Sequence, residues 1–281
     1  MLAAPRSGST LLFETLAEAP AVWTVGGESH RYIEGLRRLH SVAGGIGSNR
    51  LDASHADERI VEVLRRRFAR QLRDRDGLRF FDNPHIERLR FLEKTPKNAL
   101  RQPFLEKVFP GSLYVFLVRD PQPNISSMME AWKGGRFVTY PRLPGWQGLR
   151  WSLLLPPGWQ QLKGRPLAEV CAYQWATANR IILDDLGRLP PDRWMACSYE
   201  ALTGDPQGTI ERICRFAAYA TDDRLRRRVA TELPLSRSTQ TRPDPDKWRR
   251  NEGEILPVTA PGHPFGVFET WKQCRTVAQR T

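Results

Sequence analysis

The sequence lacks the arrangements that mark a disulfide framework, a zinc site or a membrane protein. Its 281 residues include four cysteines, none in CxxC spacing, and no histidine stands near them in a zinc-binding pattern. No apolar core of roughly 7–15 residues, typical of a secretory signal, opens the chain. No apolar run approaches the ~20 residues that cross a membrane. These absences predict buried free thiols in a soluble, cytoplasmic protein.

Acidic residues are also comparatively scarce. There are 31 of them against 43 lysines and arginines, which gives a formal net charge of +12. Such a balance favours anionic partners, namely nucleic acid, a membrane surface or phosphorylated small molecules. A basic surface kept for solubility explains the charge equally well. The length and the 40% hydrophobic content suffice for one large domain or two small ones.

Strand patterns alternate with helix patterns along the chain. Residues 113–118, LYVFLV, form an unbroken apolar run, which predicts a strand buried on both faces, as in a parallel sheet. Other strands are expected at 21–25, 90–93 and 194–197, and helices at 10–19, 57–74, 100–108, 121–132, 168–186 and 206–220. This order predicts an α/β fold with a mostly parallel central sheet flanked by helices. Ligands of such sheets bind at the carboxyl ends of strands.

Two segments do not follow that alternation. Residues 133–166 are rich in glycine, proline and tryptophan and are interpreted as an ordered insertion or lid. Trp146, Trp151 and Trp159 in this segment either face the acceptor or pack a satellite core. Residues 234–281 are predicted to be a loop-rich C-terminal segment, within a single domain that spans residues 1–281.

A possible phosphate-binding loop lies close to the N-terminus, in the stretch PRSGST of residues 5–10. A glycine-bearing turn before a helix offers backbone N–H groups and the positive end of the helix dipole to an anion. The usual nucleotide loop reads GxxxxGK[ST], and alignment on Gly8 puts Ala3 and Ser9 in place of its first glycine and its lysine. Asp120 could serve as a magnesium ligand, so a P-loop kinase or NTPase remains an alternative. With so few residues before the loop, either the strand that feeds it is very short or the chain begins late.

Four separated pieces of the sequence resemble the sulfotransferases that use 3′-phosphoadenosine 5′-phosphosulfate (PAPS). PRSGST followed by LL resembles the 5′-phosphosulfate loop, and LEKTPKN resembles the lysine-bearing segment. YVFLVRDPQPNISSMM resembles the 3′-phosphate signature, and CSYEALTGDP the tyrosine-bearing strand end. Their order and spacing match over residues 1–206, closest to the bacterial and carbohydrate-type branch. The resemblance implies a three-layer, P-loop-like fold.

The resemblance also implies where the donor binds. Arg119 and Ser127 would hold its 3′-phosphate, Tyr199 would pack near its adenosine, and Lys94 would contact the phosphosulfate and stabilise the departing phosphate oxygen. The loop would hold the 5′-phosphosulfate through Arg6, Ser7, Gly8, Ser9 and Thr10. Sulfuryl transfer needs no metal, because fixed cations and amides can stabilise an in-line transition state.

The catalytic base is expected in TVGGESHRYIEG, at the end of the second strand. In the family a glutamate at this place is the usual base, which favours Glu28, with His30 as the alternative. Glu93 is a third candidate, although its neighbour Lys94 makes an ion-pair role the better explanation. Arg249 and Arg250 are weaker candidates for closing over the 3′-phosphate.

The sequence therefore predicts metal-independent sulfuryl transfer from PAPS to a hydroxyl or amine, with release of adenosine 3′,5′-bisphosphate (PAP). The acceptor would be a small molecule such as a sugar, a lipid, a polyketide or another natural product, with no nucleic acid and no membrane span involved. The alternatives are a P-loop small-molecule kinase or NTPase and a basic, non-enzymatic polyanion-binding protein.

Overall fold

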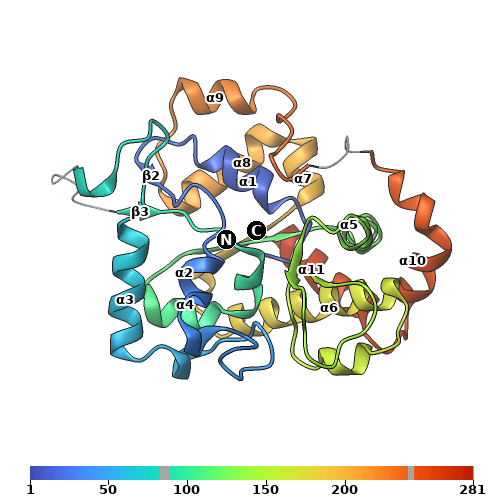
Figure 1. Ribbon diagram of the computed structural model, residues 1–281. Coiled ribbons are helices and arrows are strands. Elements are labelled where there is room, and N and C mark those ends of the chain that lie inside the picture. The colour runs from blue at the N-terminus through green and yellow to red at the C-terminus, as the bar shows by residue number, and fades with distance from the viewer. Residues whose placement is uncertain (83–88, 240–243, 281) are drawn as a thin grey trace.

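A three-stranded parallel sheet forms the centre of the computed structural model, which describes residues 1–82, 89–239 and 244–280. Its strands are β1 (Leu2–Ala3), β4 (Tyr114–Val118) and β7 (Trp194–Ser198), in the order β1-β4-β7 (Figure 1). Every residue of β4 is buried, as its unbroken apolar run predicts. The predicted mostly parallel sheet is confirmed, and β1, which leads into the PRSGST loop, has only two residues.

Helices cover both faces of this sheet. Because side chains alternate along a strand, Phe116 and Val118 of β4 lie in one hydrophobic cluster, and Val115 and Leu117 lie in another. The first cluster includes buried residues of α5 (Pro121–Lys133), α6 (Leu167–Leu186), α10 (Glu252–Thr259) and α11 (Val267–Arg280). The second includes residues of α1 (Ser9–Leu16), α7 (Tyr199–Gly204), α8 (Pro206–Ala217) and α9 (Asp223–Val229). The result is the expected three-layer α/β architecture.

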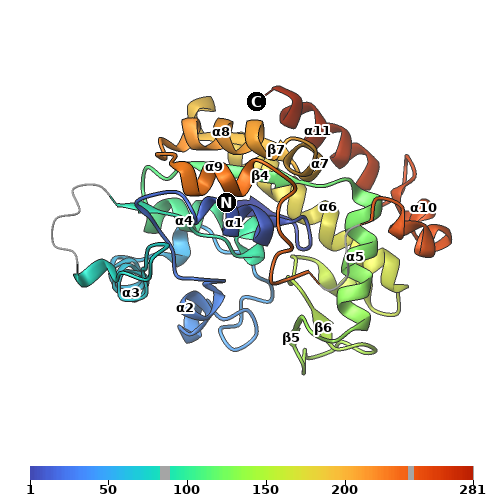
Figure 2. The ribbon, with the colours of Figure 1, turned by 90° about the horizontal axis from the view of Figure 1, so that it is seen from above.

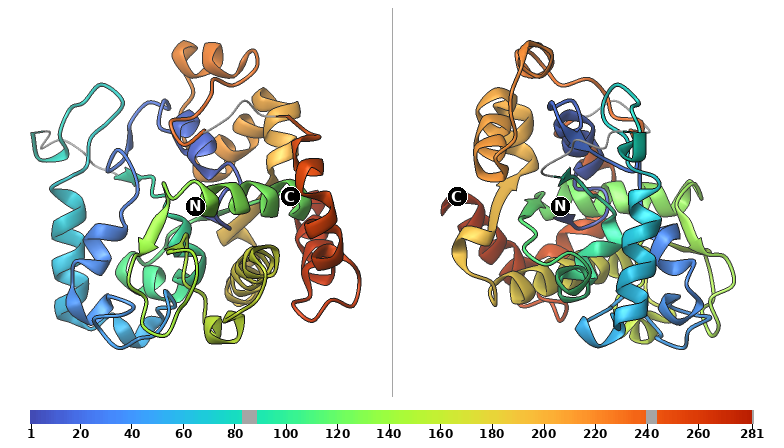
Figure 3. Two further views of the ribbon diagram at one scale, coloured as in Figure 1. Left: turned by 45° about the vertical axis from the view of Figure 1, so that its right-hand side comes forward. Right: turned by 90° about the vertical axis from the view of Figure 1, so that its left-hand side faces the viewer.

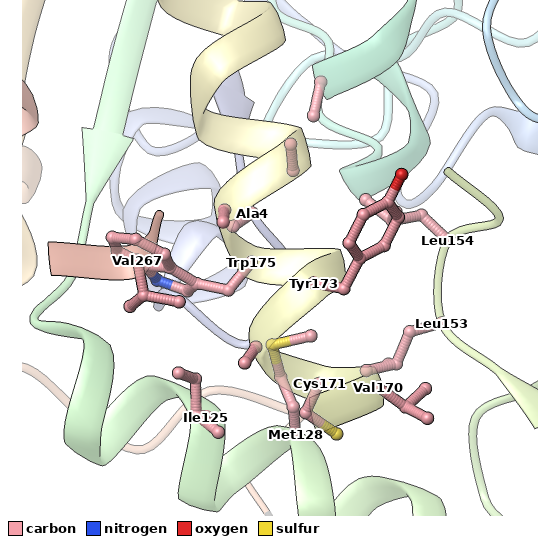
Figure 4. Packing of buried hydrophobic residues seen from close by; sticks show 14 of the residues in the cluster. Ala4, Ile125, Met128, Leu153, Leu154, Val170, Cys171, Tyr173, Trp175 and Val267 are labelled. Atoms are coloured by element: carbon pink, nitrogen blue, oxygen red, sulfur yellow. The ribbon is translucent and has the colours of Figure 1, made fainter. Parts of the chain in front are cut away.

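Helix α6 supplies much of the first cluster. Figure 4 shows Trp175 of α6 beside Val267 of α11, while Cys171 lies near Met128 of α5. Trp175 and Cys171 are fully buried. The N-terminal region of α5 follows directly from β4, because Pro121 occupies its first turn and cannot continue the strand.

A third cluster lies at one edge of the molecule and involves α2 (His30–Glu34), α3 (Glu58–Ala69) and α4 (Gln102–Val108) (Figures 1 and 3). Helix α3 begins where the Asp57 carboxylate accepts a hydrogen bond from the Ile60 amide, 2.9 Å away. A small parallel pair, β2 (Val22–Trp23) with β3 (Arg90–Phe91), connects this edge to the rest of the fold.

The insertion at 133–166 contains an antiparallel pair, β5 (Val138–Tyr140) with β6 (Trp151–Ser152), which lies beside α5 in Figure 2. The rings of Trp146, Trp151 and Trp159 pack edge to face, with centroids 4.7–6.2 Å apart. Trp151 is fully buried and Trp159 is 5% exposed, so both rings belong to the core instead of an open acceptor-facing surface.

The predicted loop-rich C-terminal segment at 234–281 is wrong for most of its described part. Residues 252–259 and 267–280 are the helices α10 and α11, while residues 240–243 and 281 lie outside the described residues. Helix α10 forms despite Pro257 in its interior, because Ile255 and Val258 are buried in the first cluster. Helix α11 buries Val267 and Cys274 there as well. Tertiary packing therefore outweighs the proline and charge content of the segment.

Within residues 1–82, 89–239 and 244–280, the helices are all too short or too polar to traverse a lipid bilayer.

Candidate active site

The PRSGST loop runs from the end of β1 to the start of α1 and is tied to α5. Arg6 and Gly8 adopt positive φ values of 66° and 89°. The Ser7 hydroxyl donates to Oδ1 of Asn124, 2.7 Å away, and Nδ2 of Asn124 donates to the Pro5 carbonyl at 2.8 Å. These two bonds fix the turn that precedes the first-turn amides of α1, and such a fixed turn before a helix suits an anion.

Tyr199 lies against the same loop. A Cβ atom added at Gly8 would stand 2.3 Å from Cδ2 of Tyr199, so the ring occupies the space that only a glycine leaves. The guanidinium carbon of Arg119 lies 4.4 Å from the centroid of this ring. Arg119 directly follows β4, and Tyr199 directly follows β7. The carboxyl ends of neighbouring strands thus bring both residues to the loop.

Replacing Gly8 with alanine is expected to disturb this contact strongly. The new methyl group would both overlap the Tyr199 ring and strain a backbone at φ 89°. We expect a destabilisation of about 1–3 kcal/mol, because the ring must move, and weaker binding of PAP if the loop holds this nucleotide as the sequence predicts. Thermal unfolding and calorimetric titration of Gly8→Ala measure both. Gly253→Ala, where a Cβ atom would meet nothing within 4 Å, is the control. If Gly8→Ala matches that control, the ring contact is unimportant.

Arg6 connects the residues predicted to hold the 3′-phosphate. Its Nε atom donates to Oγ of Ser127 at 3.4 Å, and its carbonyl oxygen accepts a hydrogen bond of 3.2 Å from Nη1 of Arg119. Among the described residues, the buried Nε atom of Arg119 has no hydrogen-bond partner. Burial is the main cause that lowers the pKa of Arg119, and burial followed by the charge of Arg119 lowers that of Arg6. Two neighbouring cations withdrawn from water in this way are suited to an anionic ligand.

Lys94 joins the loop to the predicted base. Its Nζ atom donates to Oγ1 of Thr10 at 3.1 Å and to Oε1 of Glu28 at 3.0 Å. The lysine is 2% exposed, whereas the Glu28 side chain is 39% exposed. A buried ammonium group thus faces the loop on one side and an accessible carboxylate on the other.

His30 lies on the open side of Glu28. Its Nδ1 atom is 3.7 Å from Oε2 of Glu28, and its side chain is 45% exposed. Burial, followed by the charge of Lys97, lowers the pKa of His30, so the imidazole is predominantly neutral near pH 7. The Glu28 and His30 side chains are thus close together and accessible, whereas the Glu93 carboxylate accepts hydrogen bonds from buried side chains.

Three residues that contact this site are not among those predicted from the sequence. Asn124 fixes the loop through the two bonds given above. The Ser238 carbonyl oxygen accepts from Nη1 of Arg6 at 3.1 Å, and its hydroxyl accepts from Thr10 at 3.2 Å. Arg237 pairs with Glu14 at 3.1 Å and donates to the Gly26 carbonyl at 2.7 Å. Asn124 stands inside the VRDPQPN piece and could have been found, but nothing local distinguishes residues 237–238.

Other residues predicted from the sequence lie apart from these contacts. The guanidinium group of Arg249 is exposed and pairs with Asp246 and Glu252 on its own segment. Across the described parts of the chain, no three histidine, cysteine, aspartate or glutamate side chains gather as a metal-binding group. The four cysteines are free and buried.

Comparison with known proteins identifies the family behind this arrangement. A model described as "Sulfotransferase family" matches residues 1–223. The chain belongs to the sulfotransferase family. No curated protein matches its sequence.

The solved structures that share the fold of this sulfotransferase include two domains of biosynthetic enzymes. A sulfotransferase domain from the curacin biosynthetic pathway is 20% identical with a TM-score of 0.50, and the match covers 98% of this chain and 95% of that domain. A sulfotransferase domain from the Synechococcus PCC 7002 olefin synthase is 21% identical with a TM-score of 0.52, and the match covers 97% and 92%. The predicted sulfotransferase-type, P-loop-like fold is thereby confirmed.

Proposed function

We propose that this sulfotransferase moves the sulfuryl group of PAPS to a hydroxyl or amine of a small-molecule acceptor and releases PAP. Lys94 is the observation that carries the proposal. It stands buried between Thr10 of the loop and the accessible carboxylate of Glu28, within 3.1 Å of each. A donor anion held by the loop and an acceptor held at Glu28 would meet at this ammonium group.

The donor fits the charges of the site. It carries a phosphosulfate and a 3′-phosphate, and the site has cations for both ends. We assign the first-turn amides of α1, Ser9, Thr10 and Lys94 to the phosphosulfate, and Arg119 and Ser127 to the 3′-phosphate. Arg6, which the resemblance places at the phosphosulfate, is reassigned to the 3′-phosphate because its Nε atom donates to Ser127. The buried Nε atom of Arg119, unpartnered among the described residues, supports this, because such a donor costs free energy unless a ligand satisfies it. Tyr199 would lie beside the adenosine.

The chemistry assigned to Glu28 is removal of the acceptor proton. The acceptor oxygen or nitrogen forms a bond to sulfur as the bond between sulfur and the phosphate oxygen breaks, and Glu28 takes the proton. Lys94 stabilises the charge that develops on the departing phosphate oxygen. His30, neutral and 3.7 Å from Glu28, can accept that proton next or act as the base itself. Metal independence stays a prediction.

Calorimetric titration with PAP in the presence of a chelator tests the proposal. We expect tight binding that does not need Mg²⁺, followed by transfer of label from [³⁵S]PAPS in an acceptor screen. If ATP with Mg²⁺ binds and PAP does not, the protein is a nucleotide-dependent kinase or NTPase. If neither nucleotide binds and nucleic acid binds with a steep salt dependence, it is a polyanion-binding protein.

A further inference from the structure

The carboxylate of Glu93 accepts hydrogen bonds from three side chains. Oε1 accepts from the hydroxyls of Ser29 at 2.5 Å and Thr95 at 2.8 Å, and Oε2 accepts from Nδ2 of Asn98. The three donors are each at most 2% exposed. Hydrogen bonds to an ionised carboxylate are shorter and stronger than those between neutral groups. Because protein donors engage both of its oxygens, Glu93 is poorly suited to act as a base.

This carboxylate fixes the residue between the two candidate bases. Ser29 stands between Glu28 and His30 and is fully buried, while its neighbours are accessible. The Ser29 amide also donates to Oγ1 of Thr95 at 2.7 Å, so both its backbone and its side chain are held. A residue anchored at two points sets the direction of the side chains on either side of it. Such an anchor constrains the backbone next to Glu28, whose side chain reaches Lys94.

The consecutive residues Glu93 and Lys94 both contact the segment of residues 28–29. Lys94 contacts Glu28 directly, and Glu93 holds Ser29. We propose that Glu93 is a positioning residue, which sets Glu28 against Lys94 and His30 without touching the reactants. The inference rests on the proposed function of Glu28 as the base. In this proposal Glu93 and Thr95 of the EKT sequence also have a role, because both hold Ser29 in place.

Glutamine is the substitution that tests this role. It keeps the size of the side chain, but its NH₂ group can only donate, so the side chain no longer accepts from Ser29, Thr95 and Asn98 at once. The anchor on Ser29 is then lost or rearranged. Titration of the His30 imidazole by NMR reports the outcome without any acceptor, with His30→Asn used to assign the resonance. Besides burial, the charges of Lys97 and Arg101 lower the pKa of His30, whereas those of Glu28 and Glu34 raise it.

The expected result is a double-mutant cycle with strong coupling. Glu28→Gln should lower the pKa of His30, because the Glu28 carboxylate raises it. Glu93→Gln should lower the pKa of His30 by at least about half as much, because Glu28 is then no longer held near the imidazole. In the double variant, Glu93→Gln should cause almost no further shift beyond that of Glu28→Gln. An unchanged His30 titration in Glu93→Gln, or shifts that simply add, would overturn the proposal.

Glu106→Gln is the matched control for loss of a structural carboxylate. The Glu106 carboxylate also accepts hydrogen bonds from three residues, namely from the Tyr114 hydroxyl at 2.9 Å, the Arg193 guanidinium at 3.0 Å and the Gly111 amide at 3.1 Å. It should leave the His30 titration unchanged. If Glu93→Gln does not fold, Ser29→Ala removes the same anchor and must give the same coupled shift. Calorimetry of PAP binding to the wild-type protein is a separate test. If PAP does not bind, the donor assignment is refuted, but the His30 titration still shows whether Glu93 positions Glu28.

Discussion

Glu28→Gln is expected to lower the turnover of sulfuryl transfer by about 100-fold or more while PAP affinity stays within about twofold of the wild type. The amide cannot take the acceptor proton, but it retains the shape of the side chain and can still contact Lys94. The donor-binding residues lie on the other side of that lysine, around Thr10. Turnover with [³⁵S]PAPS and calorimetry with PAP measure the two effects separately.

The comparison with His30→Asn decides which group is the base. If Glu28 takes the proton, His30→Asn should cost less, about tenfold, because the imidazole acts after or beside it. If His30→Asn costs more than Glu28→Gln, the assignment reverses. Turnover of Glu28→Gln that equals the wild type would remove Glu28 from the mechanism.

The parts of the fold that the sequence predicts well are those decided by local pattern. The apolar run at 113–118 indicates a strand buried on both faces, and β4 is that strand. The predicted helix at 57–74 is α3, but it ends at Ala69 because the chain turns and Arg73 forms a bridge with Thr24. Leu72 keeps the apolar spacing and is buried without being helical. A pairing between distant residues leaves no local sign at the helix end.

The same distinction applies to the site. Arg6, Lys94 and Arg119 stand in short stretches whose composition suggests anion binding, and the structure places all three around one loop. Ser238 contacts two residues of that loop from a segment that has no such composition. Glu93 can be singled out as a carboxylate beside a lysine, but its three buried donors become visible only after folding.

Arg119→Ala is expected to weaken PAP binding by about 10- to 150-fold. A hydrogen bond from a charged group contributes about 1.5–3 kcal/mol, which corresponds to this range of affinities. The buried Nε donor of Arg119 has no hydrogen-bond partner in the described part of the protein, so it is available to the ligand. The side chain also lies over Tyr199, so its removal frees the ring that we place beside the adenosine. Calorimetric titration with PAP measures the loss, and thermal unfolding checks that the variant folds.

Two further variants separate the charge of Arg119 from its shape. Arg119→Lys keeps the positive charge but not the planar fork, so PAP affinity should recover in part if charge dominates and hardly at all if paired hydrogen bonds dominate. Arg249→Ala removes an exposed arginine that pairs on its own segment, and it should leave PAP affinity unchanged. Equal PAP affinity in Arg119→Ala and the wild type would refute the 3′-phosphate assignment. If Arg119→Ala and Arg249→Ala both weaken PAP binding, both arginines contribute to the phosphate site. The C-terminal segment that contains Arg249 would then be part of the site.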